Sequence, residues 1–286
     1  MKTNRFFSVF WIIIFLGILN GCSNSTTNSN GLTKGDGKIV SQEKFVSDFN
    51  SVTLKGGLDV NIYYAEDFKV LVTTDSNIQN FVVINVNKNV LNIDIKTNSY
   101  FSATELYVDV YLPELKTVNL EGVGNIKIAD GETTEFDIIL SGGGNIDVQD
   151  FEAENVNIDL SGVGDIKFLN GKTSDFKVDL SGGGNIDVQN FDVENVNIKH
   201  SGVGNIKFKN GKISDFTIIL TGGGNIDAQN LEAENVNINH SGVGDLKIWA
   251  TDSLAINFSG GGDIYYKGNP TINNLNTTGV GQIIKM

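Results

Sequence analysis

The sequence predicts an all-β fold of the solenoid type, a parallel β-helix with about 20 residues per coil. Six consecutive blocks of twenty residues fill positions 121–240, and each begins with the pattern Ser/Thr/Glu-Gly-x-Gly-Asn/Asp-Ile. A fixed short period is typical of repeat folds, in which each unit buries its apolar face by stacking on its neighbours. The blocks also show two-residue alternation and many β-branched side chains, which favour strands over helices. We therefore expect two short strands in each coil.

Charged residues at the seventh position of the blocks indicate that one block makes one coil. They alternate in sign along the chain: Lys127, Asp147, Lys167, Asp187, Lys207, Asp227 and Lys247. With one coil per block and coils about 4.8 Å apart, each Lys stacks on an Asp, whereas a coil of two blocks would stack like charges. The alternation also records duplication of a two-block unit, but that unit still had to stack.

Side-chain volume alternates in the same way. Blocks that begin Gly-Val-Gly carry Phe at the sixteenth position and Gly at the eleventh. Blocks that begin Gly-Gly-Gly carry Val at the sixteenth position and Phe or Leu at the eleventh. Large side chains in one coil therefore face small ones in the next, which fills a narrow core without voids.

Glycines are expected to form the bends of each coil. At the Gly-x-Gly corners they would permit a positive φ or a close approach between coils. The eleventh-position glycines follow Asp or Asn, a dipeptide that is typical of turns, and so are expected to separate the two strands. Phosphate binding at these corners is disfavoured, because no Gly-x-Gly begins a helix and no Lys-Ser/Thr follows.

The repeat is less regular at both ends of one continuous domain, 38–286. Residues 38–112 are expected to form an N-terminal cap, with longer strands at 69–74, 81–86, 90–96 and 105–112 and a hairpin through Asn87-Lys88-Asn89. The segment 55–62 resembles a degenerate corner, so the helix is expected to begin there, with the hairpin inserted in it or capping its end. Regular coils fill 113–240. The coils of 241–286 are degenerate, as expected of a terminal cap, and the first of them is two residues short.

The beginning of the chain predicts a lipid anchor. Lys2 and Arg5 precede an apolar run from 6 to 19 that is too short to span a bilayer, so residues 1–21 are interpreted as a signal peptide. Leu19-Asn20-Gly21-Cys22 follows and resembles a bacterial lipobox, and Cys22 is the only cysteine. We expect Cys22 to be lipidated and to hold the protein at a membrane; ordinary signal-peptide cleavage is the alternative. Residues 22–37 then form a flexible tether.

Charge excludes some classes of partner. The formal net charge of the chain is −13, and it becomes −15, with 19 lysines and no arginine, once residues 1–21 are removed. A strongly negative chain without basic clusters argues against nucleic acid and against anionic lipid surfaces as partners.

Residues suited to catalysis or metal binding are few. His200 and His240 are two coils apart, about 9.6 Å, which is too far to share a zinc ion, so we interpret them as partly buried structural residues rather than metal ligands. No serine lies in a Gly-x-Ser-x-Gly pattern, and the calcium nonapeptide is absent because Ile occupies its Asp position. We expect no catalytic residue, no metal site and no cofactor.

Three segments in order resemble the auto-transporter adhesin head GIN domain family. They are the recurring Ser-Gly-x-Gly-Asn/Asp-Ile corner, Phe49-Asn50-Ser51-Val52 before a Gly-Gly corner, and Leu112-Pro113-Glu114-Leu115 before the repeats. The resemblance covers about 40–286. It implies a right-handed parallel β-helix in bacterial envelope proteins, often lipoproteins, and it supplies no catalytic residues.

Scaffold, leader and resemblance together predict a non-enzymatic envelope lipoprotein. At the outer membrane, on its surface or its periplasmic face, the stacked sheets would bind a glycan, a protein or another cell. A structural role as an envelope scaffold is the first alternative. A polysaccharide-processing β-helix enzyme is the second, and it is disfavoured because the outward acids repeat singly in a regular ladder.

Overall fold

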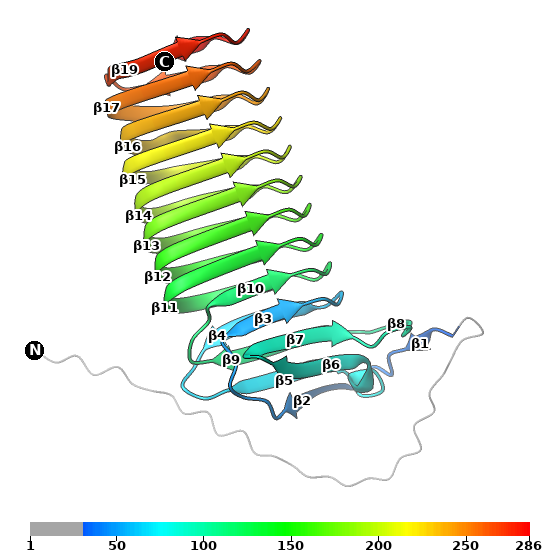
Figure 1. Cartoon of the computed structure of the whole chain (residues 1–286). Coiled ribbons are helices and arrows are strands. Elements are labelled where there is room, and N and C mark those ends of the chain that lie inside the picture. Colours follow the sequence, from blue (N-terminus) through cyan, green and yellow to red (C-terminus); the bar gives the residue numbers. More distant parts are fainter. Residues whose placement is uncertain (1–30) are drawn as a thin grey trace, which may run out of the picture.

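The computed structural model describes residues 31–286, which form a stack of coils on a broader base (Figure 1). The expected signal peptide, Cys22 and the tether up to residue 30 lie outside the described residues. Between residues 31 and 286 no helix is long and apolar enough to cross a membrane. The one helical element in this range is the short 3₁₀ helix η1 (Gln79–Phe81).

The regular shaft is a single parallel stack in which each strand pairs with the next. Among the first six strands, residues that pair between neighbouring strands are twenty positions apart in the sequence, as in Lys127↔Asp147 and Asp147↔Lys167. This register confirms the coil of about 20 residues. The strands are β11 (Ile126–Leu140), β12 (Ile146–Leu160), β13 (Ile166–Leu180), β14 (Ile186–His200), β15 (Ile206–Leu220), β16 (Ile226–His240) and β17 (Leu246–Phe258).

Each regular coil holds one strand of 15 residues that bends around the core, so the expectation of two short strands joined by a turn is wrong. Between the first two strands, pairing continues through the expected turn, with Asp130↔Asp150, Gly131↔Phe151 and Glu132↔Glu152. A reverse turn at Gly131 would give up these inter-coil hydrogen bonds. A gradual bend keeps them and places the side chain of Phe151 over the glycine.

Close approach, and not a positive φ, is what requires glycine at the corners. A Cβ atom at Gly164 would overlap the carbonyl oxygen of Gly144 in the previous coil. None of the repeated corner glycines is among the described glycines with positive φ, so of the two expected reasons for glycine it is the close approach between coils that applies there. Side chains at the fifth position secure the same corners: Asn145 Oδ1 accepts the backbone N–H of Asp165 at 2.9 Å, and Asp165 Oδ1 accepts that of Asn185 at 2.8 Å.

The core confirms the alternation of volumes. Phe136 lies opposite Val156, and Gly131 lies opposite Phe151. The rings of Phe136 and Phe151 stack with centroids 3.9 Å apart. Both side chains are buried. Phe176 and Phe191 occupy the equivalent positions two coils further on, where their rings meet edge to face with centroids 4.9 Å apart.

The β-helix begins around the segment 55–62, where the degenerate corner predicted its start. Strands β3 (Ser51–Leu54) and β4 (Asp59–Tyr64) pair in parallel with β10 (Thr117–Leu120) and with β11. On their other side they pair in parallel with β7 (Val90–Ile95) and β9 (Leu106–Leu112).

Three antiparallel strands complete the base. Strand β6 (Val82–Asn87) forms the expected hairpin with β7, and Lys88 and Asn89 in its turn both have positive φ. Strand β5 (Lys69–Asp75) pairs with β9, and β2 (Ile39–Lys44) pairs with β5 as the outermost strand (Figure 1). The hairpin therefore belongs to a cap on the N-terminal end of the stack.

The expected tether overlaps the folded body. Strand β1 (Thr33–Lys34) pairs with β8 (Phe101–Ser102), and the backbone N–H of Gly37 donates to Asp75 Oδ1 at 2.7 Å. The Asp75 carboxylate is buried and also accepts the backbone N–H of Thr104 at 2.7 Å. The body of the protein therefore begins near Thr33.

The opposite end of the stack is irregular, as expected. The register shifts where β16 meets β17, because the coil that begins at Ser241 is two residues short. The last strands are β18 (Ile264–Lys267), β19 (Thr271–Thr277) and β20 (Ile283–Lys285), and every residue of β19 is exposed.

Candidate binding surfaces

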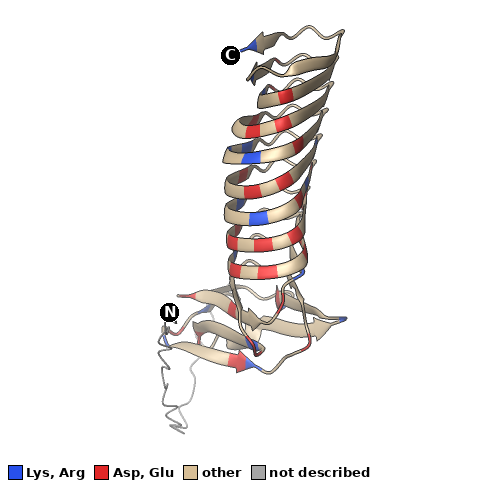
Figure 2. Cartoon of the chain, turned by 90° about the vertical axis from the view of Figure 1, so that its left-hand side faces the viewer, with Lys and Arg blue, Asp and Glu red and all other residues tan. Residues whose placement is uncertain are grey.

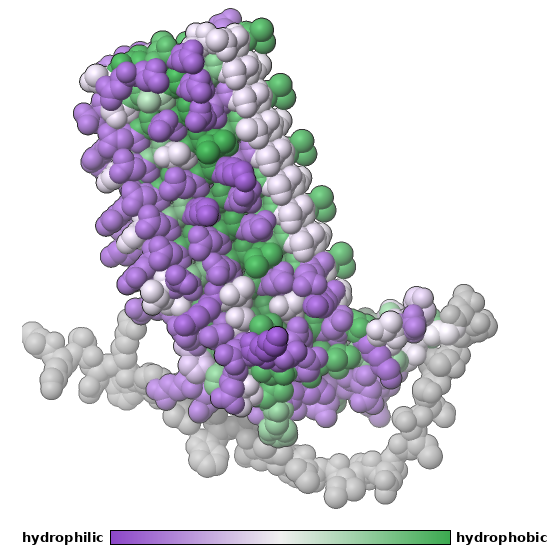
Figure 3. Space-filling view, viewed as in Figure 1, coloured by the Kyte–Doolittle hydropathy of each residue, from purple (hydrophilic) through white to green (hydrophobic). Residues whose placement is uncertain are grey.

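An apolar ridge runs along the corners of the stack. It consists of five valines at the third position of alternate corners, each 71–90% exposed: Val123, Val163, Val203, Val243 and Val280. Figure 3 shows apolar side chains that protrude at regular intervals along one edge of the stack. The glycines on both sides of each valine lie against the previous coil, so the valine side chain can only point outward. Successive valines are two coils apart, about 9.6 Å.

The gaps in the ridge are glycines. A Cβ atom at Gly143 would lie 3.7 Å from Val123 and 3.8 Å from Val163, so each gap is open to a partner. Exposed hydroxyls flank the ridge at the first position, for example at Ser141 and Ser161. Sequence reasoning saw the alternation of Gly-Val-Gly and Gly-Gly-Gly but missed this surface. An apolar residue between two corner glycines was the available signal.

An acidic groove lies on another face of the shaft. Two adjoining hollows follow positions 10 to 14 of the coils and share Tyr64 at the end nearest the base. In Figure 2 the ribbon on the face turned to the viewer is coloured at acidic positions in most coils, with basic positions in a few coils between them. Among the charged residues that line the two hollows, carboxylates outnumber the two lysines, Lys172 and Lys212. The carboxylates are Glu114, Asp130, Glu132, Asp150, Glu152, Glu154, Asp192 and Glu194.

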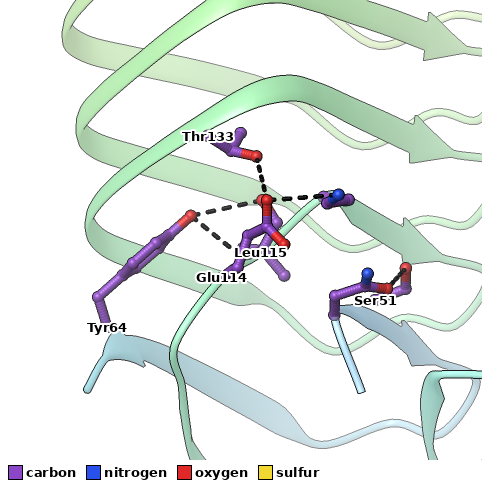
Figure 4. A network of polar contacts seen from close by, with 7 residues as sticks. Ser51, Tyr64, Glu114, Leu115 and Thr133 are labelled. Atoms are coloured by element: carbon purple, nitrogen blue, oxygen red, sulfur yellow. Dashed lines mark hydrogen bonds and ion pairs between the residues drawn. The ribbon is translucent and has the colours of Figure 1, made fainter. Parts of the chain in front are cut away.

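Tyr64 closes the base end of this groove (Figure 4). Its hydroxyl accepts the backbone N–H of Leu115 at 3.2 Å and donates to the carbonyl of the same residue at 3.4 Å. Glu114 beside it accepts the Thr133 hydroxyl at 3.3 Å and lies 3.4 Å from Lys116 Nζ. Burial raises the pKa of Tyr64, so the phenol stays protonated. Tyr64 joins the cap to the first regular coils.

The charge ladder has the predicted register but lacks direct ion pairs. Within residues 31–286, no Lys–Asp contact of 4.0 Å or less joins neighbours of the seventh-position column. Asp187 pairs instead with Lys209 at 3.6 Å, two positions along the next strand. In the groove, at the twelfth position of the coils, Glu132 and Glu152 lie directly opposite each other, so like charges face each other there.

Both histidines are fully buried, where partial burial was expected. His200 and His240 are 0% and 1% exposed, because the twentieth position faces the core in every coil. Each Nε2 lies 2.7 Å from a carbonyl oxygen, of Gly204 and Gly244 respectively, and must therefore carry the proton that is donated. Burial lowers the pKa of both side chains, so both are neutral. Leu220 lies between them in register.

Metal binding gains no support from the geometry. In the described part of the chain no group of three His, Cys, Asp or Glu side chains is arranged to hold a metal ion. Cys22, the predicted lipidation site, lies outside the described residues.

Several solved structures are similar to this chain. A protein described as a putative adhesin from Parabacteroides merdae is 24% identical with a TM-score of 0.67, over 90% of this chain and 99% of that one. A second, described as a putative adhesin from Bacteroides fragilis, is 24% identical with a TM-score of 0.56, over 88% and 99% of the two chains. A third, described as a putative lipid binding protein from Parabacteroides distasonis, is 24% identical with a TM-score of 0.63, over 89% and 99%.

No curated protein matches the chain. A family model does: the one described as "Putative auto-transporter adhesin, head GIN domain" matches residues 48–210 and 201–270, which together cover most of the chain. The solved structures share the fold with the chain, and the family match agrees with the repeated corner and the stacked coils. The chain belongs to the auto-transporter adhesin head GIN domain family.

Proposed function

We propose that this protein is a non-enzymatic adhesin-type binding protein of the bacterial envelope. A lipid on Cys22 anchors it to the membrane, and the shaft presents the valine ridge to a glycan, protein or cell-surface partner. The observation that carries the proposal is the ridge itself: five valines that are each 71–90% exposed and recur at alternate corners, in a shaft that turns most of its other large apolar side chains inward.

The ridge suits an extended partner that runs along the shaft. Each valine offers a small apolar contact, and the glycine gaps and flanking hydroxyls offer room and hydrogen bonds. Contacts that are weak singly become strong when several form on one rigid support. Methyl groups beside hydroxyls also match the mixed apolar and polar faces of sugars. The family match and the similar adhesin-named structures support the same class of function.

The test combines location with binding. Intact cells are treated with protease, with lysed cells as the control, and fragments of the region 121–240 are detected by blotting. Release from intact cells would support exposure on the cell surface. Protection until lysis would contradict the adhesin role and favour a scaffold inside the envelope.

Binding is then measured on a glycan array and on host cells with a ridge variant and a matched control. The ridge variant carries serine at four valines: Val123→Ser, Val163→Ser, Val203→Ser and Val243→Ser. The control carries Ile139→Ser and Ile219→Ser, which replace two other exposed aliphatic residues of the shaft. We expect the ridge variant alone to lose binding, with thermal stability unchanged. Equal binding by both variants would contradict the role of the ridge.

A further inference from the structure

We propose that the base of the protein contacts the lipid bilayer directly through Phe45 and Tyr100, so that the shaft stands away from the membrane. This inference rests on the anchoring at Cys22 proposed above. It goes beyond that proposal, because a lipid on Cys22 does not by itself determine which part of the body contacts the membrane.

The first argument is where the chain joins the base. Strand β1 begins at Thr33, and the Asp75 carboxylate holds the backbone N–H of Gly37. Only residues 22–30 remain between the proposed lipid and the described body. Nine residues span at most about 30 Å even when fully extended. The base is therefore the part of the body that the anchor keeps nearest to the membrane.

The second argument is the exposure of two aromatic side chains at this end. Phe45 directly follows β2, the outermost strand of the base, and is 92% exposed. Tyr100 is 68% exposed, and its carbonyl accepts the backbone N–H of Thr33 at 2.8 Å, which places it beside the tether. Aromatic side chains on a protein surface are suited to the boundary between headgroups and acyl chains. Phe45 borders a hollow that is lined by Val46 and Phe68 and also by the polar residues Glu43, Lys44 and Ser47.

The third argument is the distribution of charge. Residues 31–112 carry seven lysines and ten acidic residues, whereas residues 113–286 carry twelve lysines and twenty-four acidic residues. The base therefore has a net charge of −3 and the shaft one of −12. A shaft lying flat on an anionic leaflet would bring its charges within the Debye length of about 8–10 Å and be repelled. A standing shaft exposes only the base to that surface.

This division revises what the total charge implied. A net charge of −15 argues against contact with anionic lipid for the chain as a whole, and for the shaft that argument holds. With a net charge of only −3, the base is repelled weakly by anionic lipid, so two aromatic side chains are enough to determine whether it contacts the bilayer. The standing orientation would also hold the ridge clear of the membrane, along a shaft about 40 Å long.

The experiment measures which tryptophans lipid can quench. After removal of the leader, Trp249 is the only tryptophan, and it lies near the far end of the shaft with Lys267 Nζ 3.9 Å from its ring centroid. Phe45→Trp and Tyr100→Trp place a probe in the base. Val163→Trp places a control probe at a shaft position of similar exposure, 74%. Circular dichroism first confirms that each variant is folded.

Each mature chain, residues 22–286, is coupled through Cys22 to a maleimide lipid in phosphatidylcholine–phosphatidylglycerol vesicles with brominated acyl chains. We expect emission to be lost from F45W and Y100W but not from V163W or the unsubstituted chain, relative to vesicles without bromine. Quenching of V163W as strong as that of F45W would show a shaft lying flat and overturn the proposal. No quenching of F45W and Y100W would overturn it as well.

The coupling reaction keeps this test separate from the proposed function. Because the anchor is attached chemically, the result does not depend on whether the cell lipidates Cys22. It also does not depend on what the ridge binds. Mass spectrometry of the native protein tests the lipid on Cys22 independently.

Discussion

Replacing Gly171 with alanine tests whether alternating volume is what packs the shaft. Gly171 lies opposite Phe191 in the next coil, and a Cβ atom at position 171 would overlap that ring. Phe191 cannot move easily, because it is buried and its centroid lies 4.9 Å from that of Phe176 and 5.5 Å from that of Phe168. We expect Gly171→Ala to lower the free energy of unfolding by about 1–3 kcal/mol, the usual cost of overpacking.

A second substitution should relieve the first. Leu231 occupies the position of Phe191 two coils further on, where it lies opposite Gly211. Phe191→Leu alone should cost about 1–2 kcal/mol through the cavity that it leaves. In the double variant the new methyl group occupies part of that cavity, so the two losses should fall short of their sum by about 1 kcal/mol.

Urea unfolding followed by circular dichroism measures all four proteins. Equal m-values would show that the variants expose the same surface on unfolding, so that differences in midpoint report differences in stability. Gly143→Ala is the control, because a Cβ atom there meets only two valine methyl groups at ordinary contact distance. Its effect should stay within about 0.5 kcal/mol. If the losses from Gly171→Ala and Phe191→Leu simply added, the alternation of volumes would not be what holds these coils together.

Three further predictions concern the corner glycines, the buried histidines and the base. Gly164→Ala should cost more than Gly171→Ala, on the order of 4 kcal/mol or a failure to fold, because the new methyl group meets backbone that cannot turn aside; a melting temperature close to that of the parent protein would contradict this. Burial lowers the pKa of His200 and His240 in the folded state, so the unfolded chain takes up protons first, and stability should be constant above about pH 6.5 and fall as the pH drops below it. Urea midpoints at several pH values would show this, and the variant carrying His200→Leu and His240→Leu should lose part of the slope; an unchanged slope would exclude the histidines as its cause. Asp75→Ala should cost about 2–3 kcal/mol, because three hydrogen bonds to a buried carboxylate are lost. Faster amide exchange at residues 33–38 should accompany that loss, whereas unchanged exchange there would show that Asp75 does not fasten this segment.

The length of the coil could be predicted from the sequence because the pattern that indicates it recurs every twenty residues. Charge alternates in sign from Lys127 to Lys247, and Phe alternates with Val, from one block to the next. Both patterns stabilise the stack only if residues twenty positions apart lie opposite each other, so both indicate the pairing register directly. The hairpin through Lys88 and Asn89 was predictable because its signal is local.

Features that depend on direction in space could not be obtained in this way. Val123 and Val163 share the Gly-x-Gly context of a packed corner, and only the path of the backbone shows that they point outward. The burial of His200 required knowing which way the twentieth position faces. The contact between Gly37 and Asp75 joins residues 38 positions apart in a segment without a repeat, so no sequence pattern predicts it.

The alternation of large and small side chains also limits how such a gene can change its length. Deleting residues 141–160 would set Phe136 against Phe176 and Gly131 against Gly171, a clash beside a void. Deleting residues 141–180 would set Phe136 against Val196 and Gly131 against Phe191, which restores the packing of the parent. Recombination between repeats should therefore survive selection in pairs of coils. Relatives are then expected to differ in reach by steps of about 9.6 Å, each step adding or removing one valine of the ridge.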